Sequence, residues 1–281
     1  MAIDIVIPAH NEDRRIGRTL WAYRRRLSGS DVRFLVALDG CTDDTYEVVR
    51  SHAQDDPRVL ALRYPKLGKG GVLSEAFRQC DAPLIGFVDA DCATPPGEFV
   101  RLAEVATRAD GAIASRRHPS AVLAARRPAS RALTSLAFSA GVRRLFRLPY
   151  ADTQCGAKVF RREVVHGVLP YLSARDFLFD VDLLLTAHRL GYQVEEVPTV
   201  WIHREGSRLH VGRDSGLMAL CSLRLWFHHR VLPVPPSPPP TGDEWADVTV
   251  LAGDRRAPGT PAPVGSLVAN EAAGEDVRVA P

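Results

Sequence analysis

Two carboxylates one residue apart follow a strongly apolar segment. Residues 83–88 (Pro-Leu-Ile-Gly-Phe-Val) read as a buried strand and run directly into Asp89, Ala90 and Asp91. Residues that follow the carboxyl end of such a strand face the crevice where open α/β sheets bind ligands. Paired carboxylates at that point suit a divalent metal held jointly with a diphosphate. Asp180 and Asp182 repeat the spacing without this strand context, so the first pair is the stronger candidate.

Polar residues also follow two earlier predicted strands. The first strand ends in residues 8–12 (Pro-Ala-His-Asn-Glu), and the second ends in Leu38, Asp39 and Gly40. Both ends should face the same crevice as Asp89. Asp39 resembles an acidic residue that reads a base or a ribose, and a second carboxylate at a strand end has no evident structural need. We therefore interpret Asp39 as a ligand-binding residue.

A glycine-rich segment, residues 66–71 (Lys-Leu-Gly-Lys-Gly-Gly), precedes a predicted helix. It lacks the spacing and the Lys-Ser/Thr ending of a Walker loop. A glycine-rich helix N-terminus with lysines is nevertheless a natural anion site. A plain surface turn is the alternative interpretation.

Residues 116–151 contain eight arginines and no acidic residue. A one-sign stretch of this kind indicates an anionic partner. Aromatic residues are not interleaved as stacking platforms and no nucleic-acid motif is present, so nucleic acid is not the expected partner. Apolar residues interleave with the arginines over 133–146, which is typical of a lipid-adjacent surface, with ordinary core packing as the alternative.

Three later segments are also candidates for chemistry. Residues 152–156 (Asp-Thr-Gln-Cys-Gly) are dense in polar groups just ahead of the apolar run 157–160. Asp182 lies at the start of a leucine-rich helix, where a carboxylate stabilises the helix dipole and needs no further role. Residues 201–208 hold basic groups that could clamp a diphosphate.

The elements alternate regularly in the first half of the chain. Apolar strands are expected at 3–7, 32–38, 58–63, 84–88 and 111–115, with helical patterns at 12–27, 43–54, 69–80 and 97–108. This order predicts an α/β fold with a mostly parallel, doubly wound sheet flanked by helices. The second half is less regular, with a helical stretch at 119–147, a strand near 156–160, a helix near 177–190, strands near 192–203 and an amphipathic segment at 213–231.

Composition sets the limits of the folded unit. Beyond residue 232 the chain carries 10 of its 21 prolines, and seven acidic residues against three arginines give that tail a net charge of −4. We expect a folded domain over 1–232, with net charge +7, and a disordered tail over 233–281. No stretch reaches the ~20 apolar residues of a membrane span, and a strand at the very start leaves no room for a signal peptide. Five cysteines without paired or metal-type spacing fit a reduced cytosolic protein.

Taken in order, the motifs resemble family 2 glycosyltransferases, in particular dolichyl-phosphate β-glucosyltransferases and related polyprenyl-phosphate sugar synthases. The similar segments span roughly residues 3–231. They are residues 6–12, 39–40, 68–71, 89–94, 115–116, 152–156, 179–182 and 206–208. The resemblance implies a GT-A (Rossmann-like) fold, a nucleotide-diphospho-sugar donor and Mg²⁺ or Mn²⁺.

The resemblance also implies roles for individual residues. The nucleotide-sugar site would be formed by Pro8, Asn11, Glu12, Asp39, Lys69, Asp89, Ala90, Arg204 and Arg208. Asp89 and Asp91 would hold the metal, Asp91, Asp180 and Arg116 would act in catalysis, and Arg116, Arg117 and Arg131 would bind an acceptor phosphate. The chain departs from the pattern at Leu38, where an acid is usual, at Cys92, where a small glycine is common, and in lacking the membrane helix with which the eukaryotic enzymes begin.

These expectations combine into one leading hypothesis. It is an inverting transfer of a hexose, glucose from UDP-glucose, to a polyprenyl phosphate, by a cytoplasmic protein attached peripherally to the membrane through the arginine-rich stretch and residues 217–232. An acceptor phosphate is already anionic and needs no protein base. A hydroxyl acceptor would need a carboxylate to take its proton, for which Asp180 and Asp152 are the candidates. The alternatives are therefore transfer to a hydroxyl acceptor and a sugar-nucleotide-binding module without turnover.

Overall fold

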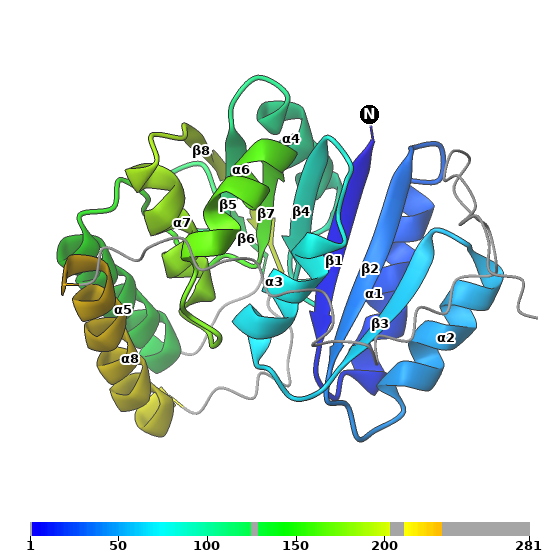
Figure 1. Ribbon diagram of the computed structural model, residues 1–281, viewed down its shortest axis with the longest axis horizontal. Coiled ribbons are helices and arrows are strands. Elements are labelled where there is room, and N and C mark those ends of the chain that lie inside the picture. The colour runs from blue at the N-terminus through cyan, green and yellow to red at the C-terminus, as the bar shows by residue number, and fades with distance from the viewer. Residues whose placement is uncertain (1, 125–128, 203–210, 232–281) are drawn as a thin grey trace, which may run out of the picture.

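The computed structural model describes residues 2–124, 129–202 and 211–231 (Figure 1). Its elements are, in chain order, β1 (Ile3–Ala9), α1 (Asp13–Arg26), β2 (Val32–Asp39), α2 (Thr45–Asp55), β3 (Val59–Tyr64), α3 (Lys69–Arg78), β4 (Leu84–Val88), α4 (Pro96–Ala106), β5 (Gly111–Ser115), β6 (Val122–Leu123), α5 (Ala129–Phe146), β7 (Ala157–Arg161), α6 (Arg162–Val168), the 3₁₀ turn η1 (Leu169–Tyr171), α7 (Phe179–Arg189), β8 (Val194–Pro198), β9 (Val200–Trp201) and α8 (Val211–Val231). The alternation expected in the first half is confirmed.

The main sheet of the described chain has seven strands in the order β3-β2-β1-β4-β7-β5-β8. Strands β3, β2, β1 and β4 are parallel, and so are β5 and β8. Strand β7 lies between these two groups and runs antiparallel to both β4 and β5. The strand order reverses between β1 and β4, and such a switch point opens a crevice at the carboxyl ends of the strands.

Helices cover both faces of the sheet, and each face has its own apolar core (Figure 1). Alternate residues of a strand point to opposite faces. Accordingly, Ile3, Ile5 and Ile7 of β1 pack in one core with α1, α2 and α4, whereas Val6 packs in the other with α3, α6 and α7. The strands are therefore held from both sides, and the ends of β1, β2 and β4 are fixed relative to one another.

The second half differs from the sequence-based expectation in three ways. The helix expected over 119–147 is described as α5 from Ala129 onward, whereas residues 122–123 form strand β6, which pairs with β9, and residues 125–128 lie outside the described ranges. Helix α6 was not anticipated. The expected strand at 156–160 exists as β7, but its antiparallel direction depends on which neighbours it pairs with, and apolar character does not reveal direction.

Helices α5 and α8 pack against each other at one end of the molecule (Figure 1). Helix α8 buries Leu225 in the second core, whereas Leu220, Leu223 and Phe227 are exposed. Within the described residues, no helix is long and apolar enough to cross a membrane.

Candidate functional site

The loop that carries Asp89 and Asp91 begins where β4 ends, and two side chains of helix α1 donate hydrogen bonds to its backbone. Thr19 donates a hydrogen bond from Oγ1 to the carbonyl of Ala90 at 2.6 Å, and Tyr23 donates from its hydroxyl to the carbonyl of Thr94 at 2.9 Å. Both side chains are fully buried. The two carboxylates are therefore displayed on a loop with a fixed backbone.

The Asp91 carboxylate is partly buried and lies beside a second negative charge. Its Oδ1 accepts a hydrogen bond from the backbone N–H of Ala93 at 2.9 Å. Burial, and next the charge of Asp89, raise the pKa of Asp91. Two neighbouring carboxylates of this kind carry an excess of negative charge that a bound cation relieves.

A chain of alternating charges extends from Asp89 into the core. Lys69, the first residue of α3, places its Nζ 3.0 Å from Asp89 Oδ1 and 3.2 Å from Asp180 Oδ2. The other oxygen of Asp180 pairs with Lys158 of β7, whose Nζ also donates to the carbonyl of Cys155 at 2.8 Å. Lys158 is fully buried and Asp180 nearly so. Two of the four charged groups are thus buried, and a third, the side chain of Lys69, is 18% exposed.

The network sets the protonation states of its members. Burial alone would raise the pKa of Asp180, but Lys158 and Lys69 outweigh it, so the pKa lies below its ordinary value. Burial alone would lower the pKa of Lys69, but Asp180 and Asp89 raise it instead. At neutral pH Lys69 is therefore a cation beside Asp89, and Asp180 is an anion.

Gly156 permits the close approach of β7 to the candidate metal loop. The backbone N–H of Asp89 donates to the carbonyl of Gly156 at 3.0 Å. A Cβ atom at position 156 would lie 1.8 Å from Asp89 Oδ2. Only glycine therefore leaves the Asp89 carboxylate where it is.

The glycine turn before α3 is not the free anion site that the sequence led us to expect. The N–H groups of Gly70 and Gly71 donate to the carbonyl of Arg175, at 3.0 and 3.3 Å. These are two of the amides that an anion at a helix N-terminus would use. Lys69 is therefore the group in this turn that is directed at the Asp89 loop.

The ends of β1 and β2 are tied together by side chains. Asn11 has a positive φ of 55° and accepts a hydrogen bond on Oδ1 from the N–H of Thr42 at 2.8 Å. The Asp39 carboxylate accepts from Lys66 Nζ at 2.7 Å, and from the N–H groups of Leu67 and Gly68 at 2.6 and 3.1 Å. Our premise that Asp39 has no structural need was wrong, because it anchors the turn before α3.

The other predicted nucleotide-site residues lie at the same edge of the sheet. Pro8 is within β1 and pairs with Ala37 of β2. Glu12 precedes α1 and forms an ion pair with Arg15 at 2.6 Å. Ala90 is buried between the two metal-candidate aspartates. The structure thus brings together the strand-end residues that the sequence singled out.

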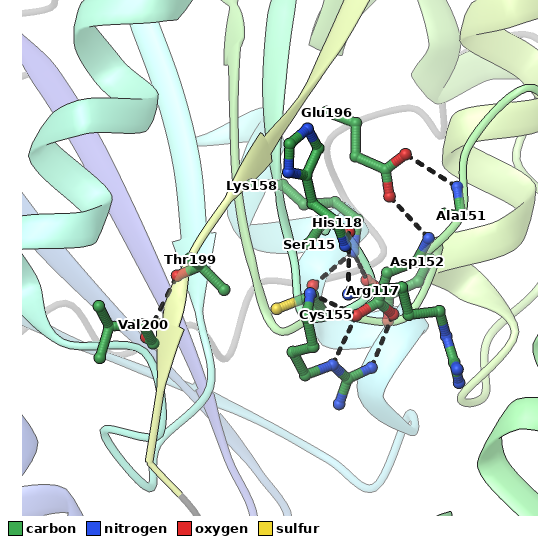
Figure 2. Close-up of polar contacts among 12 residues, drawn as sticks. Ser115, Arg117, His118, Ala151, Asp152, Cys155, Lys158, Glu196, Thr199 and Val200 are labelled. Carbon is green, nitrogen blue, oxygen red and sulfur yellow. Dashed lines mark hydrogen bonds and ion pairs between the residues drawn. The ribbon is translucent and has the colours of Figure 1, made fainter. Parts of the chain in front are cut away.

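Arg116 is held by a buried carboxylate. Asp152 accepts hydrogen bonds from the Nε and Nη2 atoms of Arg116 at 2.6 and 2.7 Å, and from its backbone N–H at 3.0 Å. Figure 2 shows how Glu196 in turn accepts from the N–H groups of Ala151 and Asp152, both at 2.8 Å. Burial alone would raise the pKa of Asp152, but Arg116 lowers it to about 2.

The remaining predicted site residues are four arginines. The backbone N–H of Arg117 donates to Ser115 Oγ at 3.2 Å. Arg131 lies in α5, and its side chain is outside the described part of the structure. Arg204 and Arg208 lie outside the described residues. The chain just before Arg204 is attached to the loop that carries Asp89 and Asp91, because the N–H of Ile202 donates to the carbonyl of Ala93 at 2.9 Å.

The donor set fits a hard divalent cation shared with a substrate. Among the described residues, no cluster of three or more His, Cys, Asp or Glu side chains could hold a metal by itself. Mg²⁺ is commonly held by one or two carboxylates together with substrate phosphates and water. Asp89 and Asp91 match that pattern, so the residues present fit a cation that binds together with a diphosphate.

Two residues central to this geometry were missed by the sequence analysis. Lys158 lies within what reads as an apolar run, and a lysine between buried residues in a strand was the available signal. The contact between Gly156 and Asp89 joins residues 67 positions apart, and no local pattern predicts it. Lys158 lies in the antiparallel strand β7, and Gly156 immediately precedes that strand.

The sequence and the fold are similar to those of known glycosyltransferases. The model of glycosyl transferase family 2 matches residues 4–169. Glycosyltransferase AglD of Haloferax volcanii is 31% identical over 238 residues, which are 82% of this chain and 38% of that protein. Undecaprenyl-phosphate mannosyltransferase of Micrococcus luteus is 31% identical over 73% of this chain and 85% of its own length. Dolichyl-phosphate β-glucosyltransferase of Saccharomyces cerevisiae is 28% identical over 77% of this chain and 72% of its own length.

Solved structures agree on the fold. A complex of Mycobacterium tuberculosis glucosyl-3-phosphoglycerate synthase with Mn²⁺, UDP and glucosyl-3-phosphoglycerate has a TM-score of 0.58 at 20% identity, covering 83% of this chain and 81% of the synthase. The mostly parallel sheet flanked by helices is thus the GT-A fold. The family match extends over more than half of the chain and includes β1, β2, β4 and the loop with Asp89 and Asp91, so this protein belongs to glycosyltransferase family 2 and is a glycosyltransferase.

Proposed function

We propose that this enzyme transfers a hexose, glucose from UDP-glucose, to a polyprenyl phosphate with inversion at the anomeric carbon. Dolichyl-phosphate β-glucosyltransferases and an undecaprenyl-phosphate mannosyltransferase are among its relatives, which supports this acceptor class. The synthase that shares its fold was solved with Mn²⁺ and UDP, which supports a nucleotide-sugar donor and a divalent metal.

The observation that carries the choice of acceptor is the pairing of both candidate bases with cations. Asp180 has a lysine on each oxygen, and Asp152 receives three hydrogen bonds from Arg116. Such carboxylates are poor proton acceptors, because protonation would cost the ion pairs. A hydroxyl acceptor needs a base, whereas a phosphate is already an oxyanion. The described residues thus favour a phosphate.

The proposed reaction forms one bond and breaks one. An oxygen of the acceptor phosphate attacks the anomeric carbon, and the bond from that carbon to the β-phosphate oxygen of the donor breaks as the nucleoside diphosphate leaves. Asp89 and Asp91 would hold Mg²⁺ or Mn²⁺, which as a Lewis acid would stabilise the charge on the leaving group. Lys69, whose ammonium lies 3.0 Å from Asp89 Oδ1, would add electrostatic stabilisation at the same place, and Arg204 and Arg208 are proposed to help it.

We propose that the face formed by α5 and α8 meets the membrane that contains the acceptor. Its exposed apolar side chains are Leu136, Leu220, Leu223 and Phe227. Exposed arginines flank them on both helices, at 143 and 144 in α5 and at 224 and 230 in α8. Apolar side chains surrounded by arginines suit the interface of an anionic bilayer. Arg116, Arg117 and Arg131 remain the proposed contacts for the acceptor phosphate.

The test is a transfer assay that separates lipid from water. Purified protein is incubated with Mn²⁺, undecaprenyl phosphate and labelled UDP-glucose or, in parallel, labelled GDP-mannose, and the mixture is extracted into organic solvent. We expect label from UDP-glucose in the organic phase, and none with the variant Asp91→Ala.

Each other outcome rejects a named part of the proposal. Transfer from GDP-mannose alone would correct the donor. Label that stays in water while the donor is consumed in the presence of soluble glycans would establish a hydroxyl acceptor. Binding of UDP without consumption of either donor would leave a sugar-nucleotide-binding module.

A further inference from the structure

The Asp182 carboxylate is completely buried and joins two segments that are far apart in the sequence. Its Oδ2 accepts hydrogen bonds from the N–H groups of Ser173 and Ala174 at 2.7 and 2.8 Å, and from Ser173 Oγ at 3.2 Å. Its Oδ1 contacts His229 Nε2, near the end of α8, at 2.6 Å. This pattern is more than a helix-dipole interaction, because each of these contacts is to a residue outside α7.

Arg189 determines which ring nitrogen of His229 carries the proton in the contact with Asp182. Arg189 Nη1 lies 3.0 Å from His229 Nδ1 and donates to the carbonyl of the same histidine at 2.8 Å. A guanidinium can only donate, so Nδ1 accepts and the ring proton is on Nε2. His229 Nε2–H therefore donates to Asp182, and the end of α8 is fixed to α7 by both backbone and side chain.

The segment that Asp182 holds packs tightly against the turn before α3. The carbonyl of Arg175 accepts from the N–H groups of Gly70 and Gly71. A Cβ at Gly70 would lie 2.4 Å from the carbonyl oxygen of Ala174, and a Cβ at Gly68 would lie 2.5 Å from that of Arg175. With so little space between the two segments, a shift of residues 173–175 has to move the first turn of α3.

That first turn carries Lys69, whose ammonium contacts Asp89 and Asp180 at 3.0 and 3.2 Å. Asp180 and Asp182 are both in the first turn of α7. The same helical turn thus holds Lys69 directly through Asp180 and indirectly through Asp182 and residues 173–175. The position of the ammonium depends on both.

We propose that Asp182 and His229 are a positioning pair that couples the placement of α8 to the affinity for the nucleotide-sugar donor. The pair does not touch the donor. It keeps residues 173–175 against Gly70 and Gly71, and so keeps Lys69 beside Asp89. This inference rests on the proposed function to the extent that the donor diphosphate binds at Lys69 and Asp89. If α8 also meets the membrane, docking and donor affinity are linked through His229.

The test compares three variants with the wild-type full-length protein. His229→Leu removes the hydrogen bond, whereas His229→Gln retains an N–H donor and should restore it. His166→Leu is the matched control, because His166 also bonds to another segment, the carbonyl of Cys80 at 3.0 Å, and that bond ties α6 to the chain just after α3 rather than to residues 173–175.

Two measurements are made on each protein. Amide hydrogen exchange without any ligand reports on residues 68–73 and 173–176. Calorimetry with Mn²⁺ and UDP, and in parallel GDP, gives the nucleotide dissociation constant. We expect His229→Leu to exchange faster in both segments and to bind nucleotide roughly tenfold more weakly, the lower end for losing a hydrogen bond to a charged group. For His229→Gln and His166→Leu, the exchange rates of these segments and the nucleotide dissociation constant should stay within about twofold of the wild-type values. Loss of an ordinary hydrogen bond that affected binding would change the dissociation constant by more than that.

The two arms separate the possible failures. If His229→Leu lowers the melting temperature but leaves exchange in these segments and the nucleotide dissociation constant unchanged, the pair is merely structural and the inference is overturned. If exchange rises but affinity does not, donor binding is independent of Lys69 placement and the inference is again rejected. If the wild type binds neither nucleotide, the proposed function fails, and the exchange arm alone decides whether α8 and the turn before α3 are coupled.

Discussion

A single methyl group at position 156 tests whether the Asp89 carboxylate must be where the structure has it. In Gly156→Ala the new Cβ would lie 1.8 Å from Asp89 Oδ2, whereas real Cβ contacts essentially never fall under 3.0 Å. The oxygen must therefore move by at least about 1.2 Å. A misplacement of about 1 Å costs roughly 100-fold in rate when geometry is decisive. We expect a loss of that order in kcat/KM, together with weaker Mn²⁺ binding.

The fold should survive this change. Gly156 is not among the glycines with positive φ, so alanine is compatible with its backbone. The Asp89 side chain is 41% exposed and can rotate away, so we expect a stability loss of only about 1–3 kcal/mol. Kinetics and Mn²⁺ titration followed by electron paramagnetic resonance measure the effect, and thermal melting checks the fold.

Gly97→Ala is the matched control, because a Cβ at position 97 in α4 meets nothing within 4 Å. It should retain wild-type activity and Mn²⁺ affinity. If Gly156→Ala does the same while folded, the Asp89 position does not govern metal binding, and the assignment of Asp89 as a metal ligand is wrong.

The remaining predictions concern stability, pH and membranes. Lys158→Met should lower stability by about 3–5 kcal/mol, measured by urea unfolding, because it leaves Asp180 with one cation in the core; a loss below about 1 kcal/mol would contradict the pairing. Asp152 has a folded pKa of about 2, below its unfolded value, so its contribution of about 2–3 kcal/mol is present above pH 4 and lost as the pH falls toward 2. The unfolding free energy of Asp152→Asn should accordingly fall less than that of wild type over this range, and equal slopes would refute the argument. The double variant Leu223→Glu, Phe227→Glu should reduce co-sedimentation with phosphatidylglycerol vesicles by at least about tenfold, because each apolar side chain buried in the bilayer interface contributes roughly 1.5–3 kcal/mol. The control Leu190→Glu, which changes an exposed leucine at the end of α7, should leave co-sedimentation unchanged.

The first half of the fold was predictable because each element has a clear local pattern. Strands such as β1 and β4 are short apolar runs, and the helices between them show regular spacing of apolar residues, so order and type follow from the sequence. The second half was less predictable because its pairing is tertiary. Strand β7 is inserted between β4 and β5, and its direction is fixed by those neighbours rather than by its own residues.

The candidate site divides in the same way. Asp89, Asp91 and Lys69 could be identified because strand ends and helix starts meet at one edge of a parallel sheet. The residues that contact them could not be identified, because Lys158 lies in β7 and Gly156 immediately precedes it, and the placement of β7 depends on its neighbours in the sheet. Asp182 shows the same limit: the sequence accounts for a carboxylate in the first turn of a helix, but not for its contacts with residues 173–174 and His229.

The charge pattern of the site gives a physical reason to expect metal and diphosphate to bind together. Asp89, Asp91 and Asp180 bring three negative charges, and Lys69 and Lys158 bring two positive ones, so the group has a net charge of about −1 when all are ionised. A diphosphate alone would meet that negative charge at close range, where repulsion is strong. A divalent cation reverses the sign to about +1, so that an incoming diphosphate is attracted rather than repelled. Because the Lys69 ammonium is directed at Asp89, it offsets part of the repulsion between the carboxylates and the incoming phosphates. The position of Lys69 is therefore as important as its charge.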